Sequence, residues 1–334
     1  MERRPAQFRF AKFLFSIRSE SPIKLPPYKG STFRGAFGHA FKKVVCVSRE
    51  RICNSCILKE KCVYSYVFET PPPSGTLKMR KYPYAPHPFV INPPLEEKGE
   101  YREGEILCFE LTLIGKSIDC LPYFIYTFDE LGRIGIGKGR GKYLLEEVKE
   151  VRPSQRIKGK DDKRGERSEE GKIIYSGKDK ILRNHFRVLT FDDLCLFESS
   201  PVRIDLLFIT PTRLKFDGRL TPKLEFHILM RNLLRRISLL SYFHCGEELE
   251  LDFKGLIEKS KEIMGTKESL SWFDWERYSN RQEKKMRMGG FIGSITFEGN
   301  FEPFFPFLLL GEYINVGKGT SFGLGKYKIL NFEF

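Results

Sequence analysis

The sequence predicts an α+β protein made of two tandem ferredoxin-like (RRM-like) units, each with the element order βαββαβ. Two glycine-rich segments suggest the duplication: GRIGIGKGRGKYLLEEV at 132–148 and VGKGTSFGLGKYKIL at 316–330. Each segment runs through Gly-Lys-Tyr into a stretch of branched apolar residues that is typical of a strand. The hydrophobic patterns before the two segments follow the same order, and 334 residues are enough to bury two cores.

Hydrophobic periodicity places similar elements in both halves. The first half is expected to contain, in order, a strand at 8–18, a helix at 31–45, extended segments at 64–69, 89–92 and 106–114, and a helix near 121–131. The second half is expected to contain a strand at 202–210, a helix at 221–243, two extended runs within 271–298, and an apolar helix at 303–313.

Composition divides the chain into three parts. We expect an N-terminal domain at 1–151 with a four-cysteine insert at 46–62, a basic linker or insertion at 152–200, and a C-terminal domain at 201–334. Residues 152–187 carry twelve Lys or Arg against six Asp or Glu. Such a stretch is typical of a mobile, solvated segment, and contact with phosphates is the alternative.

The charge balance favours a polyanionic partner. The chain has 57 Lys and Arg against 43 Asp and Glu, a formal net charge of +14 and a pI near 9.3. A membrane surface would call for a basic amphipathic helix or an anchor, and neither is evident. No apolar run approaches the roughly 18 residues of a spanning helix, and the N-terminus lacks a signal-peptide core. We therefore expect a cytoplasmic protein that binds nucleic acid.

The glycine-rich segments can present backbone N–H groups and cations to phosphates. Known nucleotide motifs do not fit them: Arg140 stands where GxGxxG needs its last glycine, and Tyr327 follows Lys326 where a P-loop needs Ser or Thr. An ordinary turn before a strand is the alternative. The residues expected to contact phosphates here are Lys138, Arg140, Gly317, Lys318, Gly319, Gly323, Gly325 and Lys326. A second basic segment, RYSNRQEKKMRM, adds Arg277, Arg281, Lys284 and Lys285 as candidates, with a solvated strand as the alternative.

Four of the eight cysteines are clustered in CVSRERICNSCILKEKC: Cys46, Cys53, Cys56 and Cys62. A reducing compartment argues against a disulfide framework in a chain of this size. The Cys-x2-Cys core lets two thiolates meet one ion, and the flanking spacers can complete a tetrahedral site. Structural zinc is the favoured interpretation, with an iron–sulfur cluster or no metal as alternatives.

The helix before this cluster carries the most suggestive chemistry. At about 100° per residue, its phenylalanines fall on one face, whereas Gly35, His39 and Lys42 fall on the other, with Lys43 at the edge. Gly35 and Gly38 each cost about 1 kcal/mol relative to alanine, which suggests close approach of a strand backbone or of RNA. An imidazole beside two ammonium groups suits phosphodiester chemistry, because it can move a proton while the cations stabilise phosphate charge. His244, near a helix end, is an alternative catalytic histidine.

Several motifs together resemble one known family. They are LPPYKGSTFRGAFGHAFKKVVC, the four-cysteine insert closing as CVYSYVFET, APHPFVINPP, LGRIGIGKGRGKYLL, RYSNRQEKKMRMGGFIGSITFEG and GKGTSFGLGKYKI. The combination resembles the CRISPR-associated endoribonuclease that processes precursor crRNA, the Cas-six family of the RAMP superfamily. The resemblance covers nearly the whole chain outside the basic insertion.

The resemblance implies metal-independent cleavage of repeat RNA, in which the 2′-hydroxyl attacks the adjacent phosphate and leaves a 2′,3′-cyclic phosphate and a 5′-hydroxyl. It assigns His39 as general acid or base, Tyr28 as its partner, and Lys42 and Lys43 as phosphate stabilisers. Lys29 and Arg34, beside these residues, join the expected RNA contacts. No cofactor is expected for catalysis.

The partners expected from the resemblance are CRISPR repeat RNA and crRNA, with assembly into a homodimer or with other Cas effector subunits left open. Two other functions also stay open. One is a non-catalytic RAMP subunit that binds crRNA within an effector complex, and the other is a zinc-bearing RNA-binding or assembly protein.

Overall fold

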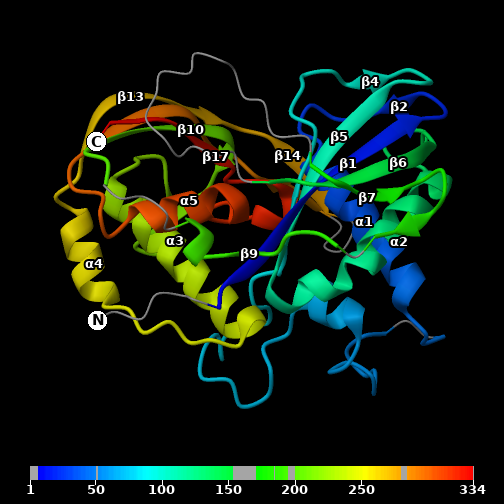
Figure 1. The fold of residues 1–334 in the computed structure, drawn as a ribbon, viewed down its shortest axis with the longest axis horizontal. Helices are drawn as coiled ribbons and strands as arrows, with labels where there is room; N and C mark the ends of the chain where they lie inside the picture. The colour runs from blue at the N-terminus through cyan, green and yellow to red at the C-terminus, as the bar shows by residue number, and fades with distance from the viewer. Residues whose placement is uncertain are drawn as a thin grey trace. The chain divides into compact units, whose positions relative to one another are not determined.

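The computed structural model describes residues 7–49, 52–152, 171–183, 185–194, 200–279 and 284–333. The chain divides into two compact units. The N-terminal unit comprises residues 9–189 and 243–246, and the C-terminal unit comprises residues 1–8, 190–242 and 247–334 (Figure 1). The boundary at 189–190 falls inside the segment that the sequence predicts as a linker. No helix among the described residues is long and apolar enough to cross a membrane.

The N-terminal unit has the predicted βαββαβ order. Its elements are β1 (Arg9–Ser19), α1 (Gly30–Val45), β3 (Phe89–Asn92), β5 (Ile106–Ile114), α2 (Leu121–Ile134) and β6 (Tyr143–Glu150). The antiparallel sheet has the order β3-β5-β1-β6 and continues into β7 (Ile173–Ser176) and β8 (Ile181–Leu182). Two further short strands, β2 (Ile23–Lys24) and β4 (Glu100–Tyr101), pair with each other, and β9 (Leu189–Thr190) pairs with β1. Part of the predicted insertion therefore extends the N-terminal sheet.

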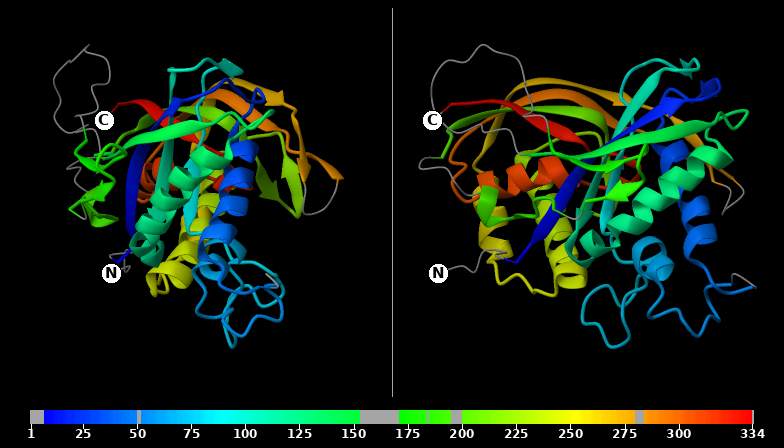
Figure 2. Two further views of the ribbon diagram at one scale, coloured as in Figure 1. Left: turned by 90° about the vertical axis from the view of Figure 1, so that its right-hand side faces the viewer. Right: turned by 45° about the vertical axis from the view of Figure 1, so that its right-hand side comes forward.

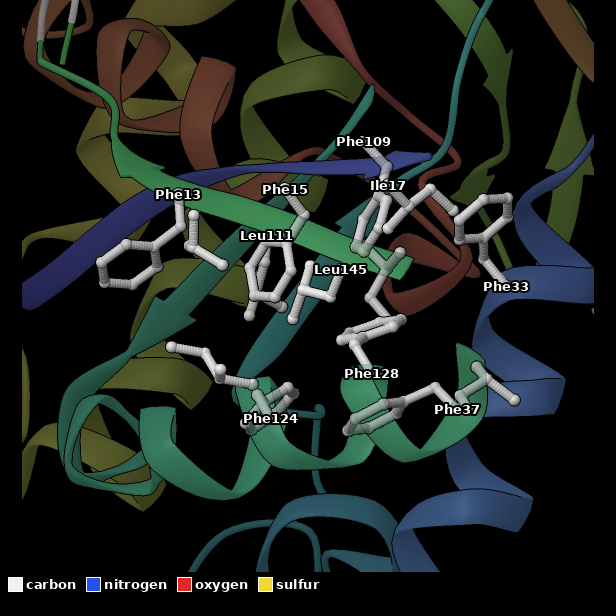
Figure 3. Packing of buried hydrophobic residues seen from close by; sticks show 14 of the residues in the cluster. Phe13, Phe15, Ile17, Phe33, Phe37, Phe109, Leu111, Phe124, Phe128 and Leu145 are labelled. Atoms are coloured by element: carbon white, nitrogen blue, oxygen red, sulfur yellow. The ribbon is translucent and has the colours of Figure 1, made fainter. Parts of the chain in front are cut away.

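Aromatic side chains join this sheet to its helices (Figure 3). Alternate residues of β1, including Phe13 and Phe15, point to the helical side because side chains alternate along a strand. Phe37 of α1 stacks on Phe124 and Phe128 of α2, with ring centroids 4.8 and 5.1 Å apart. The three-to-four-residue spacing of these side chains gives each helix one apolar face, which fixes α1 against the sheet.

The C-terminal unit repeats the arrangement with β10 (Arg203–Thr212), α3 (Phe226–Leu240), β13 (Met264–Phe273), β16 (Gly290–Glu298), α5 (Phe305–Ile314) and β17 (Tyr327–Glu333). Its antiparallel sheet has the order β13-β16-β10-β17, and α3 and α5 lie on one side of it (Figure 2). The additions are α4 (Phe253–Ser260), the pair β11 (Leu214–Phe216) and β12 (Arg219–Thr221), and the pair β14 (Glu276–Ser279) and β15 (Lys284–Arg287). Both strand orders are those of a ferredoxin-like unit, so the predicted fold class is confirmed.

One predicted element is wrong. The segment 64–69, expected to be extended, forms a π-helical turn, η1 (Ser65–Glu69). Its aromatic residues occur at every second position, a pattern typical of a strand. In the structure, however, Tyr64 and Phe68 stack one turn apart with ring centroids separated by 5.4 Å. Val67 is also buried in the N-terminal core. Packing against α1 therefore outweighs the local β pattern.

Candidate functional site

Helix α1 presents His39 on its exposed face. Gly35, His39 and Lys43 are all exposed and follow one another at intervals of four residues, so they form one stripe on the helix. The opposite face carries the buried residues Phe33, Phe37 and Phe41. The structure thus shows the orientation of His39 that the sequence predicted. Lys43, rather than Lys42, lies on the same stripe of the helix as His39.

The two glycines of α1 have different surroundings. A Cβ atom on Gly38 would overlap the ring of Phe68 from η1, so this glycine admits an aromatic ring rather than a strand backbone. A Cβ atom on Gly35 would meet nothing within 4 Å. The open surface one turn before His39 is therefore at Gly35.

Lys42 is half-buried and lies over an aromatic ring. Its ammonium is 5.3 Å from the ring centroid of Tyr64, within cation–π range. Burial raises the pKa of the Tyr64 hydroxyl, which donates to Glu69 over 3.4 Å. Lys42 therefore has a protein partner, whereas the side chain of Lys43 is directed to solvent.

Tyr28 and Lys29 lie just before α1. Tyr28 is half-buried, and burial raises the pKa of its hydroxyl. Lys29 is 1% exposed, and its ammonium donates to the backbone carbonyl of Glu96 over 2.5 Å. Burial lowers the pKa of Lys29, although the Glu96 carboxylate opposes this. The structure gives Lys29 a role in fixing the start of the helix.

Arg34 belongs to a chain of hydrogen bonds. Its guanidinium stacks on the ring of Phe68 at 3.9 Å and lies 3.1 Å from His87 Nε2. Because arginine can only donate, Nε2 accepts. Thr70 donates its hydroxyl hydrogen to the Ala85 carbonyl, so its oxygen accepts from His87 Nδ1–H over 3.2 Å. His87 is therefore a neutral imidazole that orients Arg34, an interaction the sequence analysis missed.

His244, the alternative catalytic histidine, is only 3% exposed. Its Nε2 donates to the Pro86 carbonyl over 2.7 Å, which leaves Nδ1 to accept from the Tyr66 hydroxyl over 3.3 Å. Both ring nitrogens thus have partners inside the N-terminal unit, so His244 is placed as a structural residue.

The first glycine-rich loop packs against β2. A Cβ atom on Gly137 would overlap the Lys24 carbonyl, which also accepts the backbone N–H of Lys138 over 2.9 Å. The side chains of Lys138 and Arg140 are exposed. This loop therefore uses glycine for close backbone packing and directs its two cations to solvent.

The second glycine-rich loop uses several of its backbone donors internally. Four amides donate to protein carbonyls: Lys318 to Arg213, Phe322 to Gly319, Gly323 to Thr320, and Gly325 to Pro211. Cβ atoms on Gly317, Gly319 or Gly325 would approach neighbouring atoms too closely. The amides of Gly323 and Gly325 are therefore used inside the protein, and the contact of this loop with RNA stays a prediction. The Lys318 side chain is exposed, whereas Lys326 is only 9% exposed.

The second predicted basic segment forms the two-stranded pair β14–β15. Arg277 lies opposite Met286, and Lys284 and Lys285 lie opposite Ser279 and Tyr278. Arg281 lies outside the described residues.

The four clustered cysteines are not brought together. Cys46 follows the end of α1, and the Cys56 amide donates to the Cys53 carbonyl over 3.4 Å. Cys53 and Cys62 pack against the N-terminal core. Within the described ranges, no three His, Cys, Asp or Glu side chains are grouped as metal ligands. The donor set therefore does not fit a tetrahedral zinc site in this conformation, and zinc stays a prediction.

The face of the N-terminal sheet away from the helices carries paired charges. Lys12 and Glu110 lie 2.8 Å apart, as do Lys149 and Glu147. These carboxylates neutralise Lys12 and Lys149, so neither lysine offers an uncompensated positive charge to a phosphate backbone.

Comparisons with known proteins agree with this fold. Residues 8–185 match the family model AF_1859_N, described as an N-terminal domain, and residues 206–327 match the model of CRISPR-associated endoribonuclease Cas6. A protein of Archaeoglobus fulgidus, described as uncharacterized, is 25% identical over 314 residues, which cover 91% of this chain and 92% of that protein.

Three solved structures share the fold. A Cas6 product complex matches with a TM-score of 0.57 and 16% identity, over 96% of this chain and 100% of that one. Thermus thermophilus Cas6 matches with a TM-score of 0.55 and 15% identity, over 97% and 99% of the two chains. A partial Cas6-RT-Cas1–Cas2 complex matches with a TM-score of 0.54 and 14% identity, over 98% of this chain and 46% of that one. Because the first family model covers more than half of the sequence, the chain belongs to the AF_1859_N family, and its residues 206–327 match the Cas6 model, as the Cas-six resemblance predicted.

Proposed function

We propose that this protein binds CRISPR repeat RNA and cleaves it as an endoribonuclease. The Cas6 match over 206–327 and the fold shared with a Cas6 product complex support this class of activity. The observation that carries the proposal is the exposed stripe of α1, where His39 lies between the open surface at Gly35 and the cation of Lys43. An imidazole and an ammonium so placed can reach one phosphate and its leaving group.

In the proposed reaction, the 2′-oxygen forms a bond to the adjacent phosphorus while the bond from phosphorus to the 5′-oxygen breaks. One proton leaves the 2′-hydroxyl and one reaches the departing 5′-oxygen. His39 transfers one of these protons, with Tyr28 as its partner, and Lys43 with Lys42 stabilises charge on the phosphate oxygens. The products are a 2′,3′-cyclic phosphate and a 5′-hydroxyl, and the reaction consumes no metal or cofactor.

The RNA contacts that we propose are basic residues whose side chains are exposed in the structure. Lys138, Arg140 and Lys318 have exposed side chains, and the cations of the β14–β15 segment remain candidates. Lys29 and Lys326 are left out because burial removes them from the reach of a phosphate backbone. Arg34 acts through its contacts with Phe68 and His87 rather than as a free cation.

Mapping the ends of cleaved repeat RNA tests the proposed chemistry. Labelled repeat RNA incubated with purified protein in EDTA should yield one cut with a 2′,3′-cyclic phosphate and a 5′-hydroxyl. Strict dependence on added magnesium would contradict the mechanism. Tight binding without any scission would instead favour a non-catalytic RAMP subunit.

We also propose that Cys46, Cys53, Cys56 and Cys62 bind a structural zinc after rearrangement of the 46–62 segment. The Cys-x2-Cys spacing of Cys53 and Cys56, which lets two thiolates meet one ion, supports this proposal. Elemental analysis of protein expressed with zinc should find about one ion per chain. Changing Cys53 and Cys56 to serine should remove the ion and lower the Tm, whereas metal-free wild-type protein with full thermal stability would contradict the site.

A further inference from the structure

A second stripe of α1 is covered by aromatic rings. Arg34, Gly38 and Lys42 follow one another at intervals of four residues, so they share one side of the helix. The Arg34 guanidinium lies 3.9 Å from the ring centroid of Phe68, and a Cβ atom on Gly38 would overlap the same ring. The Lys42 ammonium lies over the ring of Tyr64, 5.3 Å from its centroid. The two rings therefore line this stripe along its length.

Tyr64 and Phe68 are held together as a pair. Their ring centroids are 5.4 Å apart, and the ring planes are 22° from parallel. Tyr64 is only 7% exposed and packs in the N-terminal core, and its hydroxyl donates to Glu69. The ring of Tyr64 therefore has a fixed place, so a lysine side chain that lies over it is also held in one position.

This contact holds Lys42 next to His39. Residues three apart on a helix are surface neighbours, with Cβ atoms about 5–6 Å apart. His39 is exposed, and Lys42 is half-buried between the helix and the Tyr64 ring. Tyr64 stays neutral because burial raises the pKa of its hydroxyl, so its ring does not cancel the charge of the ammonium. The N–H groups that point away from the ring remain able to donate to a phosphate oxygen.

We propose that Tyr64 is a positioning residue, whose ring holds the Lys42 ammonium where it meets a phosphate oxygen of RNA beside His39. The inference rests on the proposed function for the identity of the polymer and for the role of His39. A lysine side chain that is already ordered loses less rotamer freedom when it binds a phosphate. The alternative is that Lys42 only covers the Tyr64 ring with its hydrocarbon stem.

Spectroscopy of the RNA-free protein tests the contact itself. In protein with isotope-labelled lysine, the Hε signal of Lys42 is identified by its loss in Lys42→Met. We expect Tyr64→Leu to move this signal downfield, because the ring current is removed, and Tyr64→Phe to leave it near its wild-type position. A signal that Tyr64→Leu does not move would overturn the inference.

A double-mutant cycle tests what the contact does. Tyr64→Leu should lower the single-turnover cleavage rate by about 2–5-fold, the range of one cation–π contact, and Tyr64→Phe should keep the wild-type rate. In the Lys42→Met background, Tyr64→Leu and Tyr64→Phe should cleave at the same rate, because no ammonium is left to hold. Lys42→Met alone, which leaves the core intact, should cost at least as much as Tyr64→Leu. An equal loss from Tyr64→Leu in both backgrounds, or a wild-type rate in Lys42→Met, would overturn the inference.

Val67→Ala is the matched control for packing. Val67 belongs to η1 and is fully buried, but it contributes no ring. This variant should lower the Tm and leave the cleavage rate unchanged. A rate loss as large as that of Tyr64→Leu would show that looser packing of η1 is the cause, and the positioning role would be lost.

The same cycle in RNA affinity separates this inference from the proposed cleavage. The probe is repeat RNA with 2′-O-methyl groups throughout, which has no 2′-hydroxyl to attack a phosphate. Tyr64→Leu should weaken its binding by about 2–5-fold when Lys42 is present and not at all in the Lys42→Met background. A wild type that never cuts but shows this coupling would lose the nuclease function and keep the role of Tyr64. A wild type that cuts without coupling in rate or affinity would keep the nuclease and lose the role of Tyr64.

Discussion

Gly35 and Gly38 lie one turn apart on α1, and their surroundings predict opposite effects of the same substitution. Gly38→Ala should lower the free energy of unfolding by about 1–3 kcal/mol, because its methyl group would collide with the Phe68 ring. Gly35→Ala is the matched control and should raise stability by up to about 1 kcal/mol, since its methyl group meets nothing and alanine favours helix. Urea unfolding measures both. Equal destabilisation by the two variants would contradict the packing described for η1.

Burial of single basic residues is the part of the site that the sequence could not predict. Lys29 and Lys326 stand among other cations and glycines, a pattern typical of phosphate contact. Their surroundings depend on tertiary neighbours: Glu96, far along the chain, accepts from Lys29. His39 was easier to place, because the helical period alone separates it from the buried phenylalanines of α1.

The glycine-rich loops show at the scale of an element that similar sequences can be packed differently. Gly139 and Gly325 both have positive φ, at 83° and 73°. A Cβ atom on Gly139 would meet nothing within 4 Å, whereas one on Gly325 would overlap the Val316 carbonyl. Gly139→Ala should therefore lower the free energy of unfolding by only about 1–2 kcal/mol, the backbone strain of a residue with a Cβ atom in this conformation. Gly325→Ala should lower the Tm much further, and a similar Tm for the two variants would show that the second loop is not closed as described.

Lys318 and Lys326 flank the same loop but differ in exposure, which predicts different binding effects. Lys318→Ala should reduce the slope of log RNA affinity against log salt by about 0.7, because one phosphate contact on single-stranded RNA is lost. Lys326→Ala should leave that slope unchanged, because its side chain is buried. Affinities measured across a salt series test the pair. A wild-type slope in Lys318→Ala would place the RNA elsewhere.

At the level of elements, the sequence predicted both βαββαβ orders because long amphipathic helices and apolar strands leave strong periodic patterns. The prediction was wrong at 64–69, where the alternating aromatic residues form a helical turn that packs on α1. It also missed β7 and β8, since the basic composition around them suggests a solvated segment although Ile174 is fully buried. Tertiary contacts decide such short elements.

At the scale of the whole molecule, the net charge of +14 indicates a polyanionic partner but does not locate it. Ion pairs such as Lys12–Glu110 neutralise cations on one sheet face. Exposed cations on α1 and on the glycine-rich loops, such as Lys43 and Lys138, are the candidates that we propose for phosphate contact. The account of function therefore depends on specific sites, and the most specific of them is His39.

The single-turnover rate of repeat-RNA cleavage by the His39→Ala variant tests this claim most directly. Wild-type or variant protein, in excess over labelled repeat RNA, is incubated with the RNA in EDTA. The RNA affinity of the same protein preparations is measured in parallel. His185→Ala, which removes another exposed histidine of the N-terminal unit, is the control and should behave as wild type. We predict that His39→Ala lowers the cleavage rate by roughly 100-fold or more while its affinity stays within a few-fold. Cleavage by His39→Ala at the wild-type rate would contradict the role of His39 and, with it, the active site described on α1.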